Sequence, residues 1–163
     1  MPTIKIIGLG NAFHADDAVG IVVARQLLPY KSPSVSIIEG GLAGLTLLHE
    51  MEGTDKLILI DAVSSQSEAG NIVRFTLPQD LHTIGQLTWG SSISSTHAFG
   101  LGEALTLANT LQLLPQEVIL YGIELGHIQS GEPLSPRVSR AIPSVVFRII
   151  HEELGLSTCA TSN

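Results

Sequence analysis

A continuous aliphatic run, Leu57-Ile58-Leu59-Ile60, constrains the fold of this chain more than any other feature of its sequence. A strand without polar side chains needs cover on both of its faces, which is typical of the centre of a parallel sheet. Shorter apolar runs that are bounded by turn-forming residues predict further strands. These predicted strands span residues 4–7, 34–38, 71–77 and 118–123.

Segments with helical periodicity alternate with these strands. Over residues 16–28 apolar side chains recur at helical spacing, and Pro29 closes the pattern. Pro143 falls inside the last helical pattern, so we expect it to kink that helix or to mark a late start. Residues 78–96 are polar and show no periodicity, which predicts a long loop. The other predicted helices span residues 43–51, 97–113 and 137–154.

This alternation predicts an α/β domain with three layers, in which a mostly parallel twisted sheet lies between helices on both faces, as in phosphorylase- or hydrolase-like folds. A chain of 163 residues suits one domain. We expect that domain to span residues 1–155 and residues 156–163 to form a flexible tail. Ligands of such sheets bind outside the carboxyl ends of the strands, so functional residues are expected there.

Composition excludes several classes of partner. Eight Lys and Arg against fifteen Asp and Glu give a net charge of −7, which argues against binding nucleic acid or an anionic membrane surface. No apolar run is long enough to span a bilayer. The single Cys159 has no partner for an internal disulfide, which fits a reducing compartment. We therefore expect a cytoplasmic protein.

The glycines after the first predicted strand, Gly8-x-Gly10, match the start of a dinucleotide-binding loop. Phe13 stands where that motif needs a third glycine, which predicts the loss of close approach between the strand and the next helix. Asp16 and Asp17 open that helix, and their carboxylates would repel a pyrophosphate. These residues argue against a nucleotide site.

Three potential metal ligands, Asp17, Asp61 and His97, fall on separate segments at the predicted carboxyl edge of the sheet. Asp16 is expected to cap the helix, which leaves the adjacent Asp17 without that task. Asp61 alone could form a turn, and His97 alone could be a polar residue at a helix start. Together they favour a shared site, and we expect them to meet within a few ångströms beside an open cleft.

The chemistry of such a site has two readings. Two carboxylates and an imidazole suit Ni, Zn, Mn, Co or Fe(II), with positions left for water or for a partner's groups. The two carboxylates could instead share a proton and activate a water molecule. A Ser–His pair built on Ser94 or Ser95 is less favoured because the chain has no G-x-S-x-G elbow, and Cys159 lies in the polar tail.

Several motifs, in this order along nearly the whole chain, resemble those of the hydrogenase maturation proteases. They are Gly8-Leu9-Gly10-Asn11, Asp16-Asp17-Ala18-Val19-Gly20, Glu39-Gly40-Gly41, Ile60-Asp61-Ala62 and Ser95-Thr96-His97. Leu42 departs from the family, which commonly has Thr in the turn after the paired glycines.

This resemblance implies an endopeptidase that removes the C-terminal extension of a nickel–iron hydrogenase large-subunit precursor after nickel insertion. It implies that Asp17, Asp61 and His97 are the catalytic and metal-binding residues. The metal would be the nickel carried by the substrate, or another divalent ion in the isolated protein. Aspartic-type and metal-dependent hydrolysis both stay open. The competing interpretation is a non-enzymatic nickel-binding maturation chaperone that uses the same three ligands.

Overall fold

The aliphatic run lies at the centre of the sheet, as its composition predicts. In the computed structural model, β3 (Lys56–Ser64) lies between β1 (Ile4–Leu9) and β6 (Glu117–Glu124) and pairs with both in parallel. Residues 57–63 of β3 are all buried. The structure describes residues 1–41, 44–93, 99–127 and 131–157.

The outer strands complete a mostly parallel sheet with the order β2-β1-β3-β6-β4. β2 (Val35–Gly41) is parallel to β1, whereas β4 (Ile72–Leu77) is antiparallel to β6. β5 (Thr88–Trp89) adds a short antiparallel pair at the end of β3. The four parallel strands therefore present their carboxyl ends at one edge of the sheet, which is where the candidate residues were expected.

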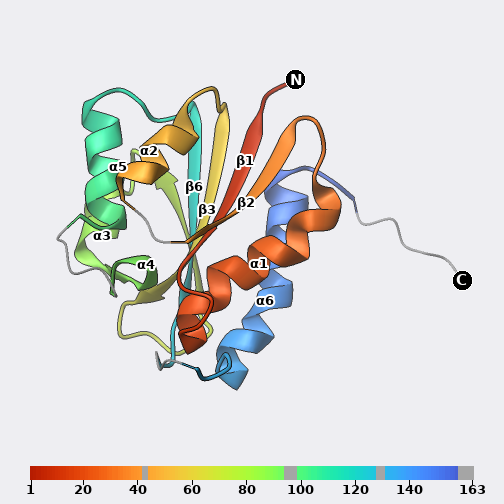
Figure 1. Cartoon of the computed structure of the whole chain (residues 1–163), viewed down its shortest axis with the longest axis vertical. Helices are drawn as coiled ribbons and strands as arrows, with labels where there is room; N and C mark the ends of the chain where they lie inside the picture. Colours follow the sequence, from red (N-terminus) through yellow and green to blue (C-terminus); the bar gives the residue numbers. More distant parts are fainter. Residues whose placement is uncertain (42–43, 94–98, 128–130, 158–163) are drawn as a thin grey trace, which may run out of the picture.

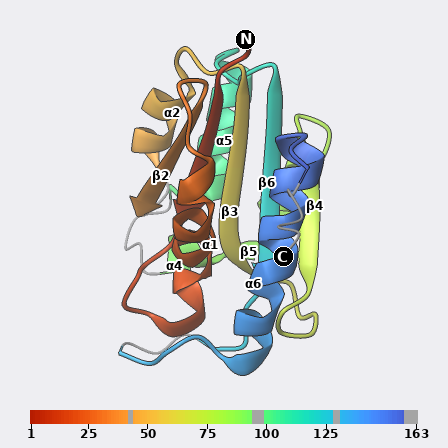
Figure 2. The same cartoon turned by 90° about the vertical axis from the view of Figure 1, so that its right-hand side faces the viewer.

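Helices cover both faces of the sheet, which confirms the three-layer α/β prediction (Figures 1 and 2). α1 (Val19–Leu27) and α6 (Pro136–Arg148) pack on one face. α2 (Leu45–Met51), α3 (Leu81–Gln86) and α5 (Leu101–Thr110) pack on the other.

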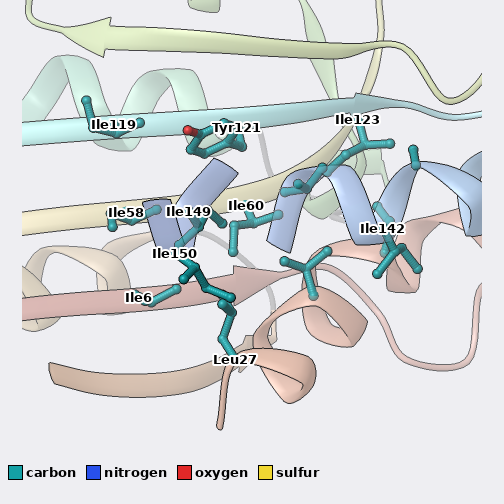
Figure 3. Close-up of a cluster of buried hydrophobic side chains, with 14 of the residues drawn as sticks. Ile6, Leu27, Ile58, Ile60, Ile119, Tyr121, Ile123, Ile142, Ile149 and Ile150 are labelled. Atoms are coloured by element: carbon teal, nitrogen blue, oxygen red, sulfur yellow. The ribbon is translucent and has the colours of Figure 1, made fainter. Parts of the chain in front are cut away.

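Alternate residues of β3 supply the two halves of the core. Ile58 and Ile60 face α1 and α6, where they pack with Leu27, Ile142 and Ile149 (Figure 3). The intervening leucines of the run face α2, α3 and α5. Burial of one such aliphatic side chain stabilises the fold by about 1.5–3 kcal/mol. This explains why the run has no polar position before Asp61.

The first helix approaches the sheet closely, so the prediction that Phe13 removes this contact is wrong. A Cβ atom placed on Gly8 would lie 2.2 Å from the carbonyl oxygen of Gly20. A Cβ atom placed on Gly20 would lie 2.3 Å from the carbonyl oxygen of Ile60 and 2.5 Å from that of Leu9. Two glycines on facing elements therefore replace the third glycine of a dinucleotide loop.

The main differences from the predicted elements lie after β4. The described part of the predicted loop over 78–96 holds α3, β5 and α4 (Gly90–Ile93), each too short to show periodicity. α5 begins later than predicted, at Leu101. α6 runs from Pro136 through Pro143, so a late start at Pro143 is wrong, and a π-helical turn (Ile149–Glu153) follows.

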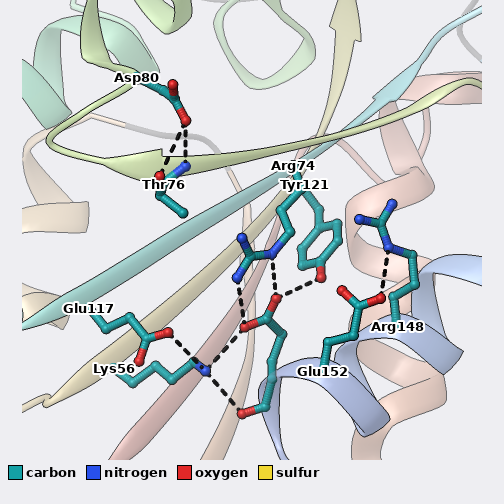
Figure 4. Close-up of polar contacts among 9 residues, drawn as sticks. Lys56, Arg74, Thr76, Asp80, Glu117, Tyr121, Arg148 and Glu152 are labelled. Atoms are coloured by element: carbon teal, nitrogen blue, oxygen red, sulfur yellow. Dashed lines mark hydrogen bonds and ion pairs between the residues drawn. The ribbon is translucent and has the colours of Figure 1, made fainter.

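A buried carboxylate ties this last turn to the sheet. Glu153 is 6% exposed and accepts hydrogen bonds from Arg74 Nε (2.7 Å) and Tyr121 Oη (2.7 Å). Lys56 Nζ lies 3.1 Å from its other oxygen (Figure 4). Burial acts to raise the pKa of Glu153, but the hydrogen bonds from Arg74, Tyr121 and Lys56 outweigh it and lower the pKa.

No helix in the described ranges combines the length and the apolar composition needed to cross a bilayer. Residues 158–163 of the predicted tail lie outside the described residues. The single domain over residues 1–155 stays a prediction.

Candidate active site

Asp61 lies inside β3 rather than after it, because the strand continues to Ser64. It follows Ile60, the last residue of β3 that pairs with β1, and it pairs with Gly122 of β6. Asp61 is fully buried. The side chains of alternate strand residues share a face, so Asp61 lies on the side of the leucines at 57 and 59.

Ser91 holds the Asp61 carboxylate in one orientation. Its backbone N–H donates to Oδ1 at 3.2 Å and to Oδ2 at 3.3 Å, and its hydroxyl donates to Oδ2 at 2.5 Å. Ser91 is itself buried and belongs to the short helix α4. The connection after β5 therefore supplies a dedicated partner for a carboxylate on the central strand.

Asp17 lies in the 3-10 turn η1 (Ala15–Ala18), next to the same strand. It is 1% exposed, and its Oδ1 has no hydrogen-bond partner within the described residues. A Cβ atom on Gly90 would lie 2.5 Å from that oxygen and 2.9 Å from the Ala62 Cβ. Only glycine at position 90 leaves room for the Asp17 carboxylate beside β3.

Burial raises the pKa of both carboxyl groups, and Asp17 also influences the ionisation of Asp61. Burial raises the pKa of Asp61 to about 8, and the charge of Asp17 adds to this effect while hydrogen bonds from Ser91 oppose it. Burial raises the pKa of Asp17 to about 6, against the effects of the Asn11 backbone N–H and of His14. The pair therefore retains a proton near neutral pH. A divalent cation between the two groups would release it.

The third predicted ligand, His97, lies outside the described residues, as do Ser94 and Ser95. Within the ranges that the structure covers, no three potential ligands are grouped closely enough to hold a metal ion. The structure thus brings together two of the three predicted residues, Asp17 and Asp61. Their donor chemistry and the unpartnered oxygen of Asp17 fit a divalent cation that has further ligands.

We expect an open cleft beside these residues, but in the described part of the chain neither of them is exposed. Asp17 and Asp61 are both buried. Two sizeable cavities in the described part of the chain lie elsewhere. One, of about 620 Å³, is lined by Leu45, Leu48, His49, Met51, Glu52 and Leu113, and another, of about 800 Å³, lies around Lys56 and Glu153.

Asp16 does not cap the helix, so that prediction is wrong. The turn η1 has no side-chain cap, and the Asp16 carboxylate points instead to the loop between β6 and α6. It accepts hydrogen bonds from the backbone N–H groups of Gly126 (2.7 Å), His127 (2.9 Å) and Ser135 (2.7 Å). The Ser135 hydroxyl donates a fourth, at 2.9 Å.

Three residues that matter at this site, Asp16, Gly90 and Ser91, have roles that the sequence did not reveal. One acid would suffice to cap the helix, so the presence of two adjacent acids indicates a further role for one of them. This pattern points only to Asp17. Gly90 and Ser91 follow Trp89 in a segment without periodicity, and nothing local marks them as neighbours of Asp17 and Asp61.

Comparison with known proteins agrees with this architecture. A family model described as hydrogenase maturation protease matches residues 21–152. The hydrogenase expression/formation protein HupD of Bradyrhizobium diazoefficiens is 32% identical over 146 residues, covering 87% of this chain and 73% of HupD. The hydrogenase 2 maturation protease of Escherichia coli K12 is 26% identical over 149 residues, covering 90% and 88%.

Solved structures show the same fold. The hydrogenase maturating endopeptidase HybD from E. coli superposes with a TM-score of 0.73 at 23% identity, covering 94% of each chain. The [NiFe] hydrogenase maturation protease HybD from Thermococcus kodakarensis gives a TM-score of 0.70 at 23% identity, covering 94% of this chain and 99% of that one.

Proposed function

Because this chain belongs to the hydrogenase maturation protease family and is a peptidase, we propose that it removes the C-terminal extension of a nickel–iron hydrogenase large-subunit precursor after nickel insertion. Maturation proteases of this family act on hydrogenase large-subunit precursors. The nickel-dependent step, the identity of the ligands and the cytoplasmic location belong to the proposal.

The observation that carries the proposal is the buried Oδ1 of Asp17, which has no hydrogen-bond partner among the described residues. A buried carboxylate oxygen without a partner is costly, so its retention favours a ligand that completes it. Asp61 provides a second carboxyl group nearby, and the charge of Asp17 helps to raise its pKa. We propose that Asp17, Asp61 and His97 together engage the nickel that the precursor already holds.

Each residue then has a distinct task. Ser91 keeps Asp61 in one orientation, so this carboxylate meets the substrate without rearrangement. Asp17 offers its unpartnered oxygen, and Asp61, whose pKa is the higher of the two, gives up the proton that the pair retains. Engagement of the precursor through these groups would place the scissile bond next to them. A water molecule held at a carboxylate would then attack the peptide carbonyl and give that carboxylate a proton, which passes to the leaving amine as the C–N bond breaks.

The test is mass spectrometry of the large subunit after incubation with nickel-loaded precursor. Asp17→Ala and Asp61→Ala should each slow removal of the extension at least about 100-fold, because each removes a group that contacts the reacting assembly. Asp55→Asn is a matched control, since this carboxylate is exposed and binds Thr3 at the opposite end of β3.

Three outcomes would contradict the proposal. Unchanged tail removal by both alanine variants would refute the assigned roles. Stoichiometric nickel binding by the wild-type protein, with no change in the mass of the large subunit, would favour the chaperone instead. Nickel-free precursor should stay uncut, and its efficient cleavage would refute nickel recognition.

A further inference from the structure

Asp16 is a buried anion that the proposed reaction does not use. It is fully buried, yet the four hydrogen bonds that its carboxylate accepts from described residues all come from one loop, between β6 and α6. Its own backbone N–H donates back to the carbonyl of His127 at 3.4 Å. Both ends of that loop, at residues 126–127 and at 135, are therefore tied to the turn η1.

The loop is built to receive this carboxylate. A Cβ atom on Gly126 would lie 3.1 Å from Asp16 Oδ2 and 3.1 Å from Ser135 Oγ, so a larger residue would crowd the contact. Ser135 precedes Pro136 at the start of α6, but its hydroxyl donates to Asp16 rather than capping that helix. Charge-assisted hydrogen bonds of this kind are about twice as strong as neutral ones.

Asp16 and Asp17 are consecutive residues of one tight turn, so their side chains diverge. Successive residues of a 3-10 turn are rotated by about 120° around its axis, because it has three residues per turn. Once Asp16 is bound to the loop on one side, Asp17 is directed to the other, toward Gly90 and β3. Ala15 enters the turn with a φ of 44°, a strained value for a residue with a side chain.

We propose that Asp16 is a positioning residue of the peptidase: its carboxylate fixes the turn η1 against the loop between β6 and α6 and so directs Asp17 toward Asp61. This inference rests on the proposed role of Asp17. It assigns Asp16 no contact with the substrate, and it predicts a specific kinetic signature.

The first measurement is the kinetics of tail removal from nickel-loaded precursor by Asp16→Asn. The amide keeps the size of the side chain but puts an NH₂ group against N–H donors, so part of the contact is lost. We expect kcat to fall at least tenfold while KM changes less than about twofold, because alignment of Asp17 is lost and docking is not. Asp55→Asn is the control, since it alters a carboxylate that accepts hydrogen bonds from Thr3 far from the site.

A second variant covers the possibility that Asp16→Asn does not fold, as judged by circular dichroism. Ser135→Ala removes one of the four donors and leaves the three backbone N–H groups in place. It should fold and lower kcat about two- to fivefold. In both variants the amide resonances of Gly90 and Ser91 should shift relative to wild type, and in Asp55→Asn they should not.

The inference is overturned if folded Asp16→Asn, or folded Ser135→Ala where the former does not fold, keeps a wild-type kcat. A rise in KM with unchanged kcat would also overturn it, since that result would make the loop a docking element. Failure of the proposed function is a separate result. In that case the wild-type protein would not remove the extension, or Asp17→Ala would remove it at the full rate. Neither result depends on the behaviour of Asp16→Asn.

Discussion

At the scale of single residues, Asp16 and Asp17 show that hydrogen-bond donors and burial together decide how an acid behaves. Both are buried in the same turn. Burial acts to raise the pKa of Asp16, but the donors from Ser135, His127 and Gly126 outweigh it and lower the pKa. Asp17 has an unpartnered oxygen in the described structure, and burial raises its pKa to about 6. One neighbour is thus a structural anion and the other is free for a ligand.

Asp61 should make the free protein less stable as the pH rises. Its folded pKa of about 8 lies above the ordinary 3.8, so between these values the folded chain holds a proton that the unfolded chain has released. The free energy of unfolding therefore falls as pH increases through that window. Asp61→Asn removes this effect, and it should be more stable than wild type by about 2–5 kcal/mol at pH 8 and nearly equal to it at pH 4.

Urea denaturation at several pH values, in the presence of a chelator, measures this difference. Asp55→Asn is the control, because hydrogen bonds from Thr3 lower the pKa of Asp55 and its charge does not change between pH 5 and 8. A gap between Asp61→Asn and wild type that stays constant or shrinks as pH rises would contradict the expectation.

The sequence predicts Asp17 and Asp61 as site residues because each stands where a predicted strand or loop reaches the carboxyl edge of the sheet. It could not find Ser91 or the true role of Asp16. Those roles depend on contacts with residues 30 and 110 to 119 positions away. No local pattern encodes contacts over such distances. The adjacent acids therefore suggest only that Asp16 caps the helix and that Asp17 is not needed for this.

At the scale of helices and strands, long apolar runs were predicted well and short elements were not. β3 carries an aliphatic run over residues 57–60 and β6 carries one over residues 118–120, both without a polar residue, as is typical of strands that are covered on both faces. α3, β5 and α4 have between two and six residues each, too few for a period to emerge. Instead, Ile84 of α3 and Trp89 of β5 pack into the core and stabilise these two elements.

The contact between α1 and the sheet predicts a large effect of Gly20→Ala. The added Cβ atom would meet the carbonyl oxygens of Ile60 and Leu9, and backbone atoms of two central strands cannot move aside. We expect a loss of about 3 kcal/mol or more in the free energy of unfolding. Gly85→Ala in α3 is the matched control, since nothing lies within 4 Å of its added Cβ atom.

Thermal unfolding of both variants checks this prediction. Gly85→Ala should be neutral or stabilising by up to about 1 kcal/mol, as expected for alanine in place of glycine within a helix. A Gly20→Ala protein as stable as wild type would show that α1 can move away from the sheet.

At the scale of the whole molecule, Glu153 joins the π-helical turn after α6 to three strands, through Lys56 of β3, Arg74 of β4 and Tyr121 of β6. Glu153→Gln leaves Arg74 and Lys56 without their buried counter-charge. We expect a loss of about 3 kcal/mol at pH 7. Glu68→Gln should cost less than about 0.5 kcal/mol, because its ion pair with Arg137 is long (3.9 Å) and exposed.

The same network should show a defined pH dependence. Because the folded pKa of Glu153 is lowered, its contribution is fully present above the ordinary pKa of 4.5 and is lost as the pH falls through the folded value. The gap between wild type and Glu153→Gln in urea denaturation should therefore close in acid. A gap that widens below pH 4.5 would contradict this assignment.

The contact between Asp16 and the loop before α6 also has a consequence for biosynthesis. The partners of Asp16 are encoded 110 to 119 residues after it. A nascent polypeptide still on the ribosome therefore cannot secure the turn that carries Asp17 until Ser135 has emerged. If that turn directs the chemistry, proteolytic competence arrives only after Ser135 has been synthesised, and products terminated before that residue would be harmless to other proteins in the cell.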